Sequence, residues 1–424
     1  MEYVRFGELY SIPSSNGVSR PSAVRGKGYK MINMGELFAN DIINDMPMER
    51  VELSQKEKEK FLVQEKDLLF ARQSLVAEGA GKCSIIKQLV EETTFESHLI
   101  RVRLNEKLCN PWFYYYLFQL SYNPVKSIVN QCAQAGIRGK ELIKIKVPLP
   151  SIGTQNKIAD ILSTYDDLIE NNNRRIALLE KAAQELYKEW FVRFRFPGYE
   201  TVKLVDSRLG KIPFNFNIIK MSEAFDYYIG GGWGNDEYST EFSEKAYVIR
   251  GTDFPHIQKG NLSTCPLRYH KKSNYIAREL KENDIIIEVS GGTAEQPVGR
   301  TIIVTNDVIG RFDTKVICAS FCKLIRLNHD IISPYFFYYW MQFLYDTRII
   351  DRFQLQSTGI INFKFEYFLR KGDIMLPPKA LMDEFELKVK SFHKQISVLA
   401  KQNENLTKQR DLLLPRLMSG KLEV

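Results

Sequence analysis

Two long segments of the chain place apolar residues at alternating steps of four and three. The first has no Pro or Gly from Thr154 to about Phe194, and the second has none from Lys379 to about Leu414. These segments predict two helices of roughly 40 residues, each about 55–60 Å long. Their repeating positions are Ile158, Leu162, Tyr165, Ile169, Asn172, Ile176, Leu179, Ala183, Leu186 and Trp190 in the first helix, and Phe385, Val389, Phe392, Ile396, Leu399, Asn403, Leu406, Arg410, Leu413 and Leu417 in the second. An unbroken seven-residue repeat is typical of coiled-coil seams.

The two amides in these seams favour an antiparallel pairing. If partners are residues whose numbers add up to 575, Asn172 lies opposite Asn403 and small Ala183 lies opposite large Phe392. A parallel pairing sets each Asn against an apolar residue, and an unpaired buried amide costs on the order of 1–3 kcal/mol. The antiparallel rule also puts Arg410 in the seam, which requires its charged end to extend toward water. The alternative is that each helix packs only on its own module.

The segments that precede the two helices repeat each other in order. The first half contains EKDLLFARQS, GKCSII, RVRLNEKLCNPWFYYYL, QAGIRGK and VPLPS, and the second contains ENDIIIEVSG, GRTIIV, IRLNHDIISPYFFYYW, QSTGIINFK and IMLPPK. Arg103 matches Arg326, and Gly136 matches Gly359, both at a separation of 223 residues. An ordered match of this length indicates two homologous modules. Within them, runs 67–72 and 284–288 predict strands, and 110–120 and 333–344 predict buried helices.

These patterns together predict a mixed α+β fold. We expect two homologous globular domains separated by two long helices that form an antiparallel coiled coil. The predicted boundaries are 1–150 for the first domain, 151–196 for the first helical region, 197–373 for the second domain, and 374–424 for the second helical region with the C-terminal tail.

Composition is that of a folded protein of two or three domains. The chain has 424 residues, of which 44% are hydrophobic and 26% charged, and no apolar run approaches about 18 residues. The N-terminus lacks the pattern of an export signal, so we expect a cytoplasmic protein. The six cysteines include no C-x-x-C pair and are expected to be reduced, with Cys318 and Cys322 in the core. A net charge of +8 permits a nucleic-acid partner without establishing one.

The motifs of common enzymes are missing. The sequence contains no phosphate-binding G-x-x-x-x-G-K-[ST], no G-x-G-x-x-G and no G-x-S-x-G, and its five histidines have no metal spacing. The run starting at Asn110 superficially resembles a loop of amino-methyltransferases, but its repeat partner starts with Ser333, so a helix start explains both better. The pair Asp166-Asp167 is expected to be solvated surface. We therefore predict no catalytic site and no metal site in this chain.

Gly-rich and polar loops with basic or amide side chains recur at corresponding places in both modules. Such loops suit a DNA duplex, because Lys and Arg neutralise phosphates, Gly allows a close backbone approach, and Arg, Gln or Asn can read base edges. The candidate DNA-binding residues are Arg20, Arg25, Lys27, Lys30, Arg72, Ser74, Gln134, Gly136, Arg138 and Lys140 in the first module, and Trp233, Asn235, Arg250, Thr252, Ser290, Thr293, Ser357, Thr358, Gly359, Asn362 and Lys364 in the second. For each loop alone, a merely solvated surface is the competing interpretation.

The chain resembles the specificity subunit of Type I restriction-modification enzymes. The resemblance lies in the segment from VPLPSIGTQNKIADIL to EWFVRFRFPG, in DSRLGKIPFNF, in LTKQRDLLLPRLMSGKLEV, and in the DLLFAR and QAGI elements. It implies two target-recognition domains that each read one half of a split DNA sequence, and helices that act as a ruler and a docking surface. It also implies two modification subunits that methylate adenine at N6, and restriction subunits that cleave. S-adenosylmethionine, ATP and Mg²⁺ belong to those partners, so no cofactor is expected in this chain.

Individual residues transfer unevenly from the family. Arg72 matches a basic residue that lies near DNA, whereas Val289 takes its place in the second module. The expected docking positions for modification subunits are Asn173, Arg174, Lys181 and Glu185 on the first long helix.

Two other functions remain open. One is a single-chain DNA methyltransferase or nuclease, against which the missing cofactor loop argues. The other is an assembly scaffold whose modules bind protein instead of DNA.

Overall fold

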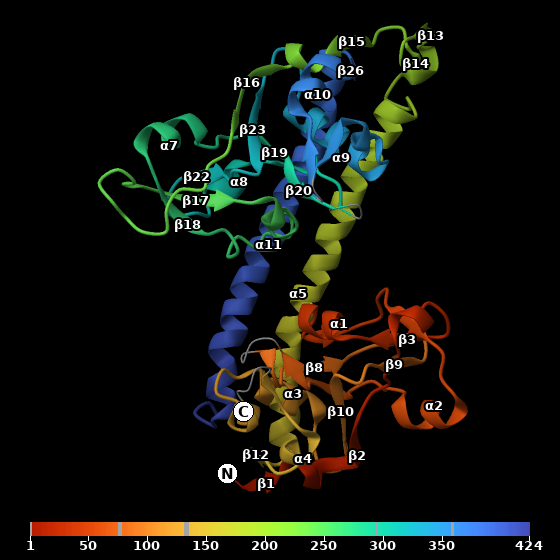
Figure 1. Ribbon diagram of the computed structural model, residues 1–424, viewed down its shortest axis with the longest axis vertical. Helices are drawn as coiled ribbons and strands as arrows, with labels where there is room; N and C mark the ends of the chain where they lie inside the picture. Colours follow the sequence, from red (N-terminus) through yellow and green to blue (C-terminus); the bar gives the residue numbers. More distant parts are fainter. Residues whose placement is uncertain (1, 75–78, 131–134, 294–295, 358–359) are drawn as a thin grey trace. The chain divides into compact units, whose positions relative to one another are not determined.

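The chain forms two compact units. The computed structural model describes residues 2–74, 79–130, 135–293, 296–357 and 360–424 (Figure 1). The first unit consists of Met1–Leu168 and Leu406–Val424, and the second consists of Ile169–Asn405. Each unit therefore contains one globular module and a part of both long helices.

The first unit is built around a five-stranded sheet with the order β2-β10-β6-β8-β4. These strands are β2 (Tyr10–Asn16), β10 (Leu99–Leu104), β6 (Leu68–Ala71), β8 (Cys83–Ile86) and β4 (Ile42–Ile43). Neighbours are antiparallel except β4 and β8, which run parallel. All four residues of β6 are buried, so both faces of the sheet are covered.

Three smaller sheets complete the first unit. The first has the order β5-β3-β9, the second pairs β1 with β12, and the third pairs β7 with β11. Their bounds are β5 (Glu49–Val51), β3 (Tyr29–Ile32), β9 (Thr93–Phe95), β1 (Tyr3–Arg5), β12 (Lys146–Pro148), β7 (Gln73–Ser74) and β11 (Ala135–Gly136).

The second unit repeats this topology. Its main sheet has the order β16-β23-β19-β21, and the smaller sheets are β18-β17-β22, β15-β26 and β20-β25-β24. The bounds are β16 (Phe225–Gly230), β23 (Cys322–Leu327), β19 (Ile285–Glu288), β21 (Thr301–Ile303), β18 (Leu267–His270), β17 (Glu244–Ile249), β22 (Val316–Cys318), β15 (Asn217–Lys220), β26 (Asp373–Leu376), β20 (Ser290–Gly292), β25 (Ile360–Phe363) and β24 (Gln354–Ser357). A further hairpin, β13 (Leu204–Ser207) with β14 (Gly210–Pro213), precedes them.

The two modules match each other strand for strand in their main sheets. The order β2-β10-β6-β8 corresponds to β16-β23-β19-β21, and every neighbouring pair within these four strands is antiparallel. The three-stranded sheets also agree, since β3 and β17 each have one antiparallel and one parallel neighbour. The strands expected at 67–72 and 284–288 are β6 and β19. Duplication of the modules therefore extends from sequence to topology.

A buried ion pair occurs at the same place in both modules. Two guanidinium nitrogens of Arg103 donate to Asp67 at 2.7 Å, and two of Arg326 donate to Asp284 at 2.8 Å. Asp67 and Asp284 are fully buried, so each carboxylate depends on its arginine for compensation.

Two aromatic helices cover the main sheets. They are α3 (Pro111–Gln119) and α9 (Pro334–Asp346), each with Pro at its first position and an N-cap side chain. The Asn110 side chain accepts a hydrogen bond from the amide of Trp112, and the Ser333 hydroxyl accepts one from Phe336. Asn110 therefore caps a helix, as the comparison with Ser333 predicted.

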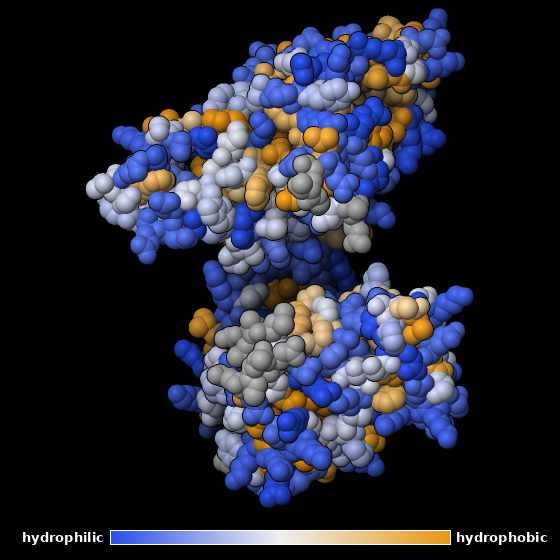
Figure 2. Space-filling view, in the orientation of Figure 1, coloured by the Kyte–Doolittle hydropathy of each residue, from blue (hydrophilic) through white to orange (hydrophobic). Residues whose placement is uncertain are grey.

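The remaining short helices are α1 (Met34–Ala39), α2 (Gln55–Phe61), α4 (Gly139–Leu142), α6 (Phe254–Gln258), α7 (Lys272–Arg278), α8 (Asn306–Ile309) and α10 (Phe365–Lys371). Hydrophilic side chains cover most of the visible face of each unit (Figure 2). Among the described residues, no helix combines the length and apolar character needed to span a membrane. The five described cysteines, including Cys318 and Cys322, are buried free thiols.

The long helices differ slightly from their predicted extents. α5 runs over Ile152–Tyr187 and continues into a π-helical turn at Lys188–Val192, while α11 runs over Lys379–Met418 and includes Pro415 (Figure 1). Pro415 lies in the last turn of α11, so the one helical hydrogen bond that its missing amide hydrogen removes lies close to the end of the helix.

In the second unit, α5 and α11 run in opposite directions and pack along their seams. The Asn172 side-chain amide donates to the Asn403 carbonyl oxygen at 2.9 Å, and both residues are buried. Trp190 contacts Phe385 with ring centroids 6.0 Å apart. A separate apolar cluster contains Ile176, Leu179, Ile396, Leu399 and Ala400. These contacts follow the antiparallel register derived from the sequence.

In the first unit, the structure corrects two sequence-based expectations. Asp166 is buried, whereas the sequence suggested solvated surface. Its carboxylate accepts hydrogen bonds from the Tyr116 hydroxyl at 2.6 Å and from Arg410 at 2.5 Å. Arg410 thus finds an internal partner instead of extending its charge only into water. Burial beside this carboxylate raises the pKa of Tyr116, so its hydroxyl stays a donor.

The amide pair yields a stability prediction. Asn172→Ala is expected to lower the free energy of unfolding by about 1–3 kcal/mol, because the buried Asn403 oxygen loses its donor. The double variant Asn172→Leu/Asn403→Leu removes both amides and should be destabilised less than the sum of the single changes. Urea denaturation measures both effects. Asn171→Ala, at an exposed neighbouring position, is the control; an equal loss in this variant would contradict the role of the amide pair.

Candidate nucleic-acid interface

Three predicted loops of the first unit meet at one end of its main sheet. β2 ends at Asn16 opposite Ile100, and β6 ends at Ala71 opposite Leu99, so the loops that follow both strands leave from the same end. The Arg72 amide donates to the His98 carbonyl at 2.8 Å, and the Arg72 carbonyl accepts from the Ile137 amide at 2.9 Å. The latter bond lies beside the pairing of β7 with β11. Segments that are distant in sequence are thereby held together.

The second unit assembles its loops in the same way. β16 ends at Gly230 opposite Lys323, and β19 ends at Glu288 opposite Cys322. The Val289 amide donates to the Phe321 carbonyl at 2.8 Å, and the Val289 carbonyl accepts from the Phe363 amide at 2.9 Å. Because Val289 occupies the position of Arg72, the two units share one backbone frame at this end of the sheet.

A fourth loop joins this end in the second unit. Arg250 follows β17, and the next residue, Gly251, lies so close to Glu288 that an added Cβ would be 2.2 Å from the Glu288 carboxylate. A larger residue there would displace the Glu288 carboxylate, which accepts two hydrogen bonds from Arg300. The loop that carries Arg250 and Thr252 is thus packed directly against the end of β19.

The basic candidates of the first unit fall into two groups. Arg20, Arg25 and Lys30 are held in ion pairs with Glu57, Glu49 and Asp45, at 2.7, 2.5 and 2.8 Å. A backbone hydrogen bond at Ser54 and the Arg20 side chain lower the pKa of Glu57 to about 2, so its charge persists at neutral pH. The second group has no ion pair with any described residue and comprises Lys27, Arg72, Arg138 and Lys140. Lys27, Arg138 and Lys140 are exposed, and Arg72 is half-buried.

In the second unit, several candidate side chains are engaged internally. Arg250 pairs with Asp253 at 2.8 Å, and this hydrogen-bonded carboxylate raises the pKa of Arg250. The Ser290 hydroxyl donates to Asn362 at 2.6 Å, and the Thr293 hydroxyl accepts from the Gln296 amide at 3.1 Å.

Other candidate side chains of the second unit face solvent. Trp233 is 41% exposed and stacks under the Arg268 guanidinium, 4.5 Å from the ring centroid. Asn235, Thr252 and Lys364 are exposed.

Some predicted positions cannot be placed. Gln134, Thr358 and Gly359 lie outside the described residues, and Ser357 is described only as the last residue of β24.

The expected docking positions on α5 differ in their surroundings. Asn173 accepts a hydrogen bond from the Asn403 amide at 2.9 Å, so it belongs to the amide layer between the helices. Glu185 pairs with Lys188 and Arg193, and Arg174 pairs with Glu170. Lys181 is exposed.

Three residues at these sheet ends were not among the sequence candidates. They are His98, which lies 3.0 Å from the Gln73 side-chain oxygen, and Phe321 and Lys323 in the second unit. Positions 98 and 321 differ by 223, which is the separation of the repeat. A comparison of the two modules at that separation could have identified His98 and Phe321 as equivalent positions.

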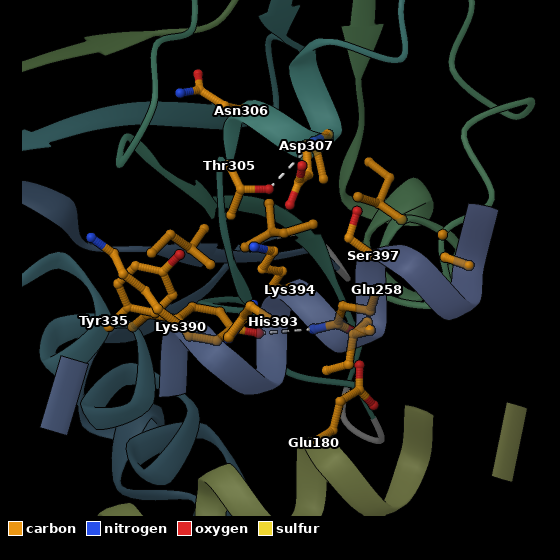
Figure 3. Close-up of a pocket in the computed structure, with 18 of the residues that line it drawn as sticks. Glu180, Gln258, Thr305, Asn306, Asp307, Tyr335, Lys390, His393, Lys394 and Ser397 are labelled. Atoms are coloured by element: carbon orange, nitrogen blue, oxygen red, sulfur yellow. Dashed lines mark hydrogen bonds between the residues drawn. The ribbon is translucent and has the colours of Figure 1, made fainter. Parts of the chain in front are cut away.

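The second unit also contains a polar cavity of about 460 Å³ beside α11 (Figure 3). His393 and Glu180 line it, and the Tyr339 hydroxyl lies 2.8 Å from the His393 ring. Burial lowers the pKa of His393 to about 4 and raises that of Glu180 to about 7. Among the described residues, no group of three His, Cys, Asp or Glu side chains could hold a metal ion.

Sequence comparison gives a match to a known protein family. Residues 1–181 match the family described as Type I restriction modification DNA specificity domain. The match covers the first globular module and most of α5. The resemblance inferred from the sequence is thereby confirmed.

Relatives with specificity-subunit names extend the similarity over both units. The chain is 27% identical to the Type I restriction enzyme MjaIX specificity subunit of Methanocaldococcus jannaschii, over 74% of this chain and 69% of the relative. It is 24% identical to a putative MjaX specificity subunit of the same organism, over 84% and 79%. The EcoKI specificity subunit of Escherichia coli is 28% identical over 41% of each chain.

One solved structure is similar in fold to this chain. The S subunit of a Type I restriction-modification system from M. genitalium has a TM-score of 0.52 and 14% identity, with 98% of this chain and 95% of that chain covered. The mixed α/β fold with long helices agrees with the predicted fold class at this level.

The cavity residues yield a pH prediction. Because the pKa of His393 is lower in the folded chain than its ordinary 6.5, the unfolded chain binds this proton more tightly. Stability is therefore lost as the pH falls from about 6.5 toward 4. His393→Gln should reduce this loss in pH-dependent urea denaturation. Glu180→Gln should instead change stability between pH 4.5 and 7, since the raised pKa of Glu180 favours the folded state at the acidic end. Identical pH profiles of parent and His393→Gln would contradict the prediction.

Proposed function

We propose that this chain is the DNA-recognition subunit of a Type I restriction-modification complex. Each globular module reads one half of a bipartite DNA target with the loops at the end of its main sheet. The observation that carries this proposal is that one backbone frame occurs twice, with Arg72 at a given place in one unit and Val289 in the other. Equal frames with different side chains suit two readers of different sequences, so the target is asymmetric.

The two long helices set the distance between the half-sites. In this proposal the recognition domains are 1–150 and 197–373, and the helical regions 151–196 and 374–424 form one antiparallel coiled coil. Support comes from the opposite directions of α5 and α11 within the second unit and from the Asp166–Arg410 ion pair within the first. A coiled coil of this kind is stiff, so it keeps the unread gap between half-sites constant.

The chemistry takes place on partner subunits. Two modification subunits methylate adenine at N6 with S-adenosylmethionine, and restriction subunits use ATP and Mg²⁺ to translocate and cleave. The missing catalytic motifs support a non-catalytic role for this chain, which we place in the cytoplasm. Of the docking positions, Lys181 and Arg174 are the most accessible on α5, and Asn173 is the least suited because it bonds to Asn403.

Mapping of N6-methyladenine in cells with and without this subunit tests the function directly. The expected result is one asymmetric bipartite motif with a fixed gap, present only when the subunit is expressed. Methyl transfer by the purified chain alone would instead support a single-chain enzyme. A complex with modification subunits that shows no salt-dependent duplex binding would favour a protein scaffold.

A deletion tests the helices as a ruler. Removal of residues 173–179 together with 396–402 takes one matched heptad from each helix and keeps Asn172 opposite Asn403. The helices become shorter by about 10 Å, which corresponds to about three base pairs. The methylated motif should keep both half-sites and lose about three base pairs from its gap. An unchanged gap would show that the helices do not set the spacing.

Arg72→Ala tests the assignment of half-sites to units. Loss of one base-reading contact is expected to cost about 1–3 kcal/mol of binding, at one half-site only. Competition between duplexes altered in either half-site measures this effect. Arg138→Ala is the comparison, because an exposed Arg that contacts phosphate should weaken binding and reduce its salt dependence without a change of preference. Equal loss at both half-sites in Arg72→Ala would indicate a general electrostatic role.

A further inference from the structure

Phe321 and His98 occupy the same position in the two units. Each lies directly before the strand that forms the second member of its main sheet, β23 or β10. The backbone carbonyl of each accepts a hydrogen bond from the amide at the loop position already compared, Val289 for Phe321 and Arg72 for His98, at 2.8 Å. The backbone at these two places is therefore equivalent, and the side chains differ.

Phe321 points away from the core. Its side chain is 66% exposed, and the residues around it in sequence, Ala319 and Cys322, are buried. A single exposed apolar residue is common on protein surfaces, so exposure alone has little meaning. The position gives it meaning. Phe321 lies beside Val289, next to the pairing of β20 with β25. The equivalent place in the first unit lies beside Arg72, next to the pairing of β7 with β11.

A cation accompanies the exposed ring. Lys323 follows two residues later, as the second residue of β23, and Phe321 lies in the turn directly before that strand. The Lys323 ammonium lies 4.6 Å from the Phe365 ring centroid and 5.7 Å from that of Tyr228. No ion pair joins it to a described carboxylate, so its charge is available for a phosphate.

We propose that Phe321 is a base-contacting residue of the second unit and that it reads the C5-methyl group of a thymine. This inference rests on the proposed function. The Phe ring has no strong hydrogen-bond donor or acceptor, so the apolar thymine methyl is the one feature of the major-groove edges that it can recognise. Lys323 neutralises a nearby phosphate and fixes the approach of the ring.

The corresponding place in the first unit is polar. His98 is exposed, its ring lies 3.0 Å from the Gln73 side-chain oxygen, and Arg72 follows β6 beside it. Arg and Gln are suited to guanine and adenine. The difference at this single place gives the two units different base preferences without a change of fold.

Uracil substitution tests the proposal in the assembled complex with its modification subunits. The duplex carries the mapped target, and each thymine of one half-site is replaced in turn by uracil, which lacks only the methyl group. The half-site to use is the one whose recognition Arg72→Ala leaves unchanged. At one position, uracil should weaken binding of the parent about fourfold, the value of one buried methyl group.

Three variants separate the possible outcomes. Phe321→Ala should bind the thymine duplex about as weakly as the parent binds the uracil duplex, and it should no longer distinguish the two. Phe321→Leu should retain the discrimination. Ile276→Ala removes another exposed apolar side chain of the same unit, on α7, and should behave like the parent.

The proposal is overturned if no uracil position weakens the parent, or if Phe321→Ala keeps the discrimination. If the parent complex binds no target duplex at all, the proposed function itself is wrong. This outcome differs from a parent complex that binds but does not distinguish thymine from uracil, which contradicts only the role of Phe321.

Discussion

Both units need residues from both long helices to complete their hydrophobic cores. In the second unit, the core contains Ala183 and Tyr187 of α5 together with Phe385 and Val389 of α11. In the first, Ile158 and Leu162 of α5 share a core with Leu414 and Leu417 of α11. Segments separated by more than 200 residues must therefore meet before either core is closed. The antiparallel packing of α5 and α11 is the constraint on which the rest of the structure depends.

The two units differ in the partners of equivalent side chains on their aromatic helices. Tyr116 and Tyr339 are equivalent hydroxyls on α3 and α9, yet the first bonds to Asp166 and the second lies beside His393. Asp166 is neutralised by Arg410, whereas the surroundings of His393 include a cavity. The ion pairs of Arg103 with Asp67 and of Arg326 with Asp284 are instead the same in both units, and each buried carboxylate needs such a partner for compensation.

The sequence predicted those features that follow from the spacing of apolar residues and from the order of repeated segments. The seven-residue repeat predicted both helices and the layer of Asn172 and Asn403, because only one register pairs the two amides. The internal repeat predicted that Asn110 begins a helix. Strand order could not be read, since it depends on contacts between distant segments. The burial of Asp166 was missed because a carboxylate appears solvated until its partners, Tyr116 and Arg410, are known.

The basic loop residues also could not be ranked from the sequence, because their ion-pair partners come from other elements. A basic loop suggests DNA, but Arg20 and Arg25 find carboxylates from other elements, Glu57 and Glu49. Such partly exposed ion pairs are each worth less than about 1 kcal/mol, so a phosphate can replace the carboxylate at low cost. The carboxylate that is left nevertheless repels the phosphate, and the net attraction is small. In the proposed interface, we therefore expect cations without an acidic partner among the described residues, above all Arg72 and Lys323, to contribute more than the net charge of +8 suggests.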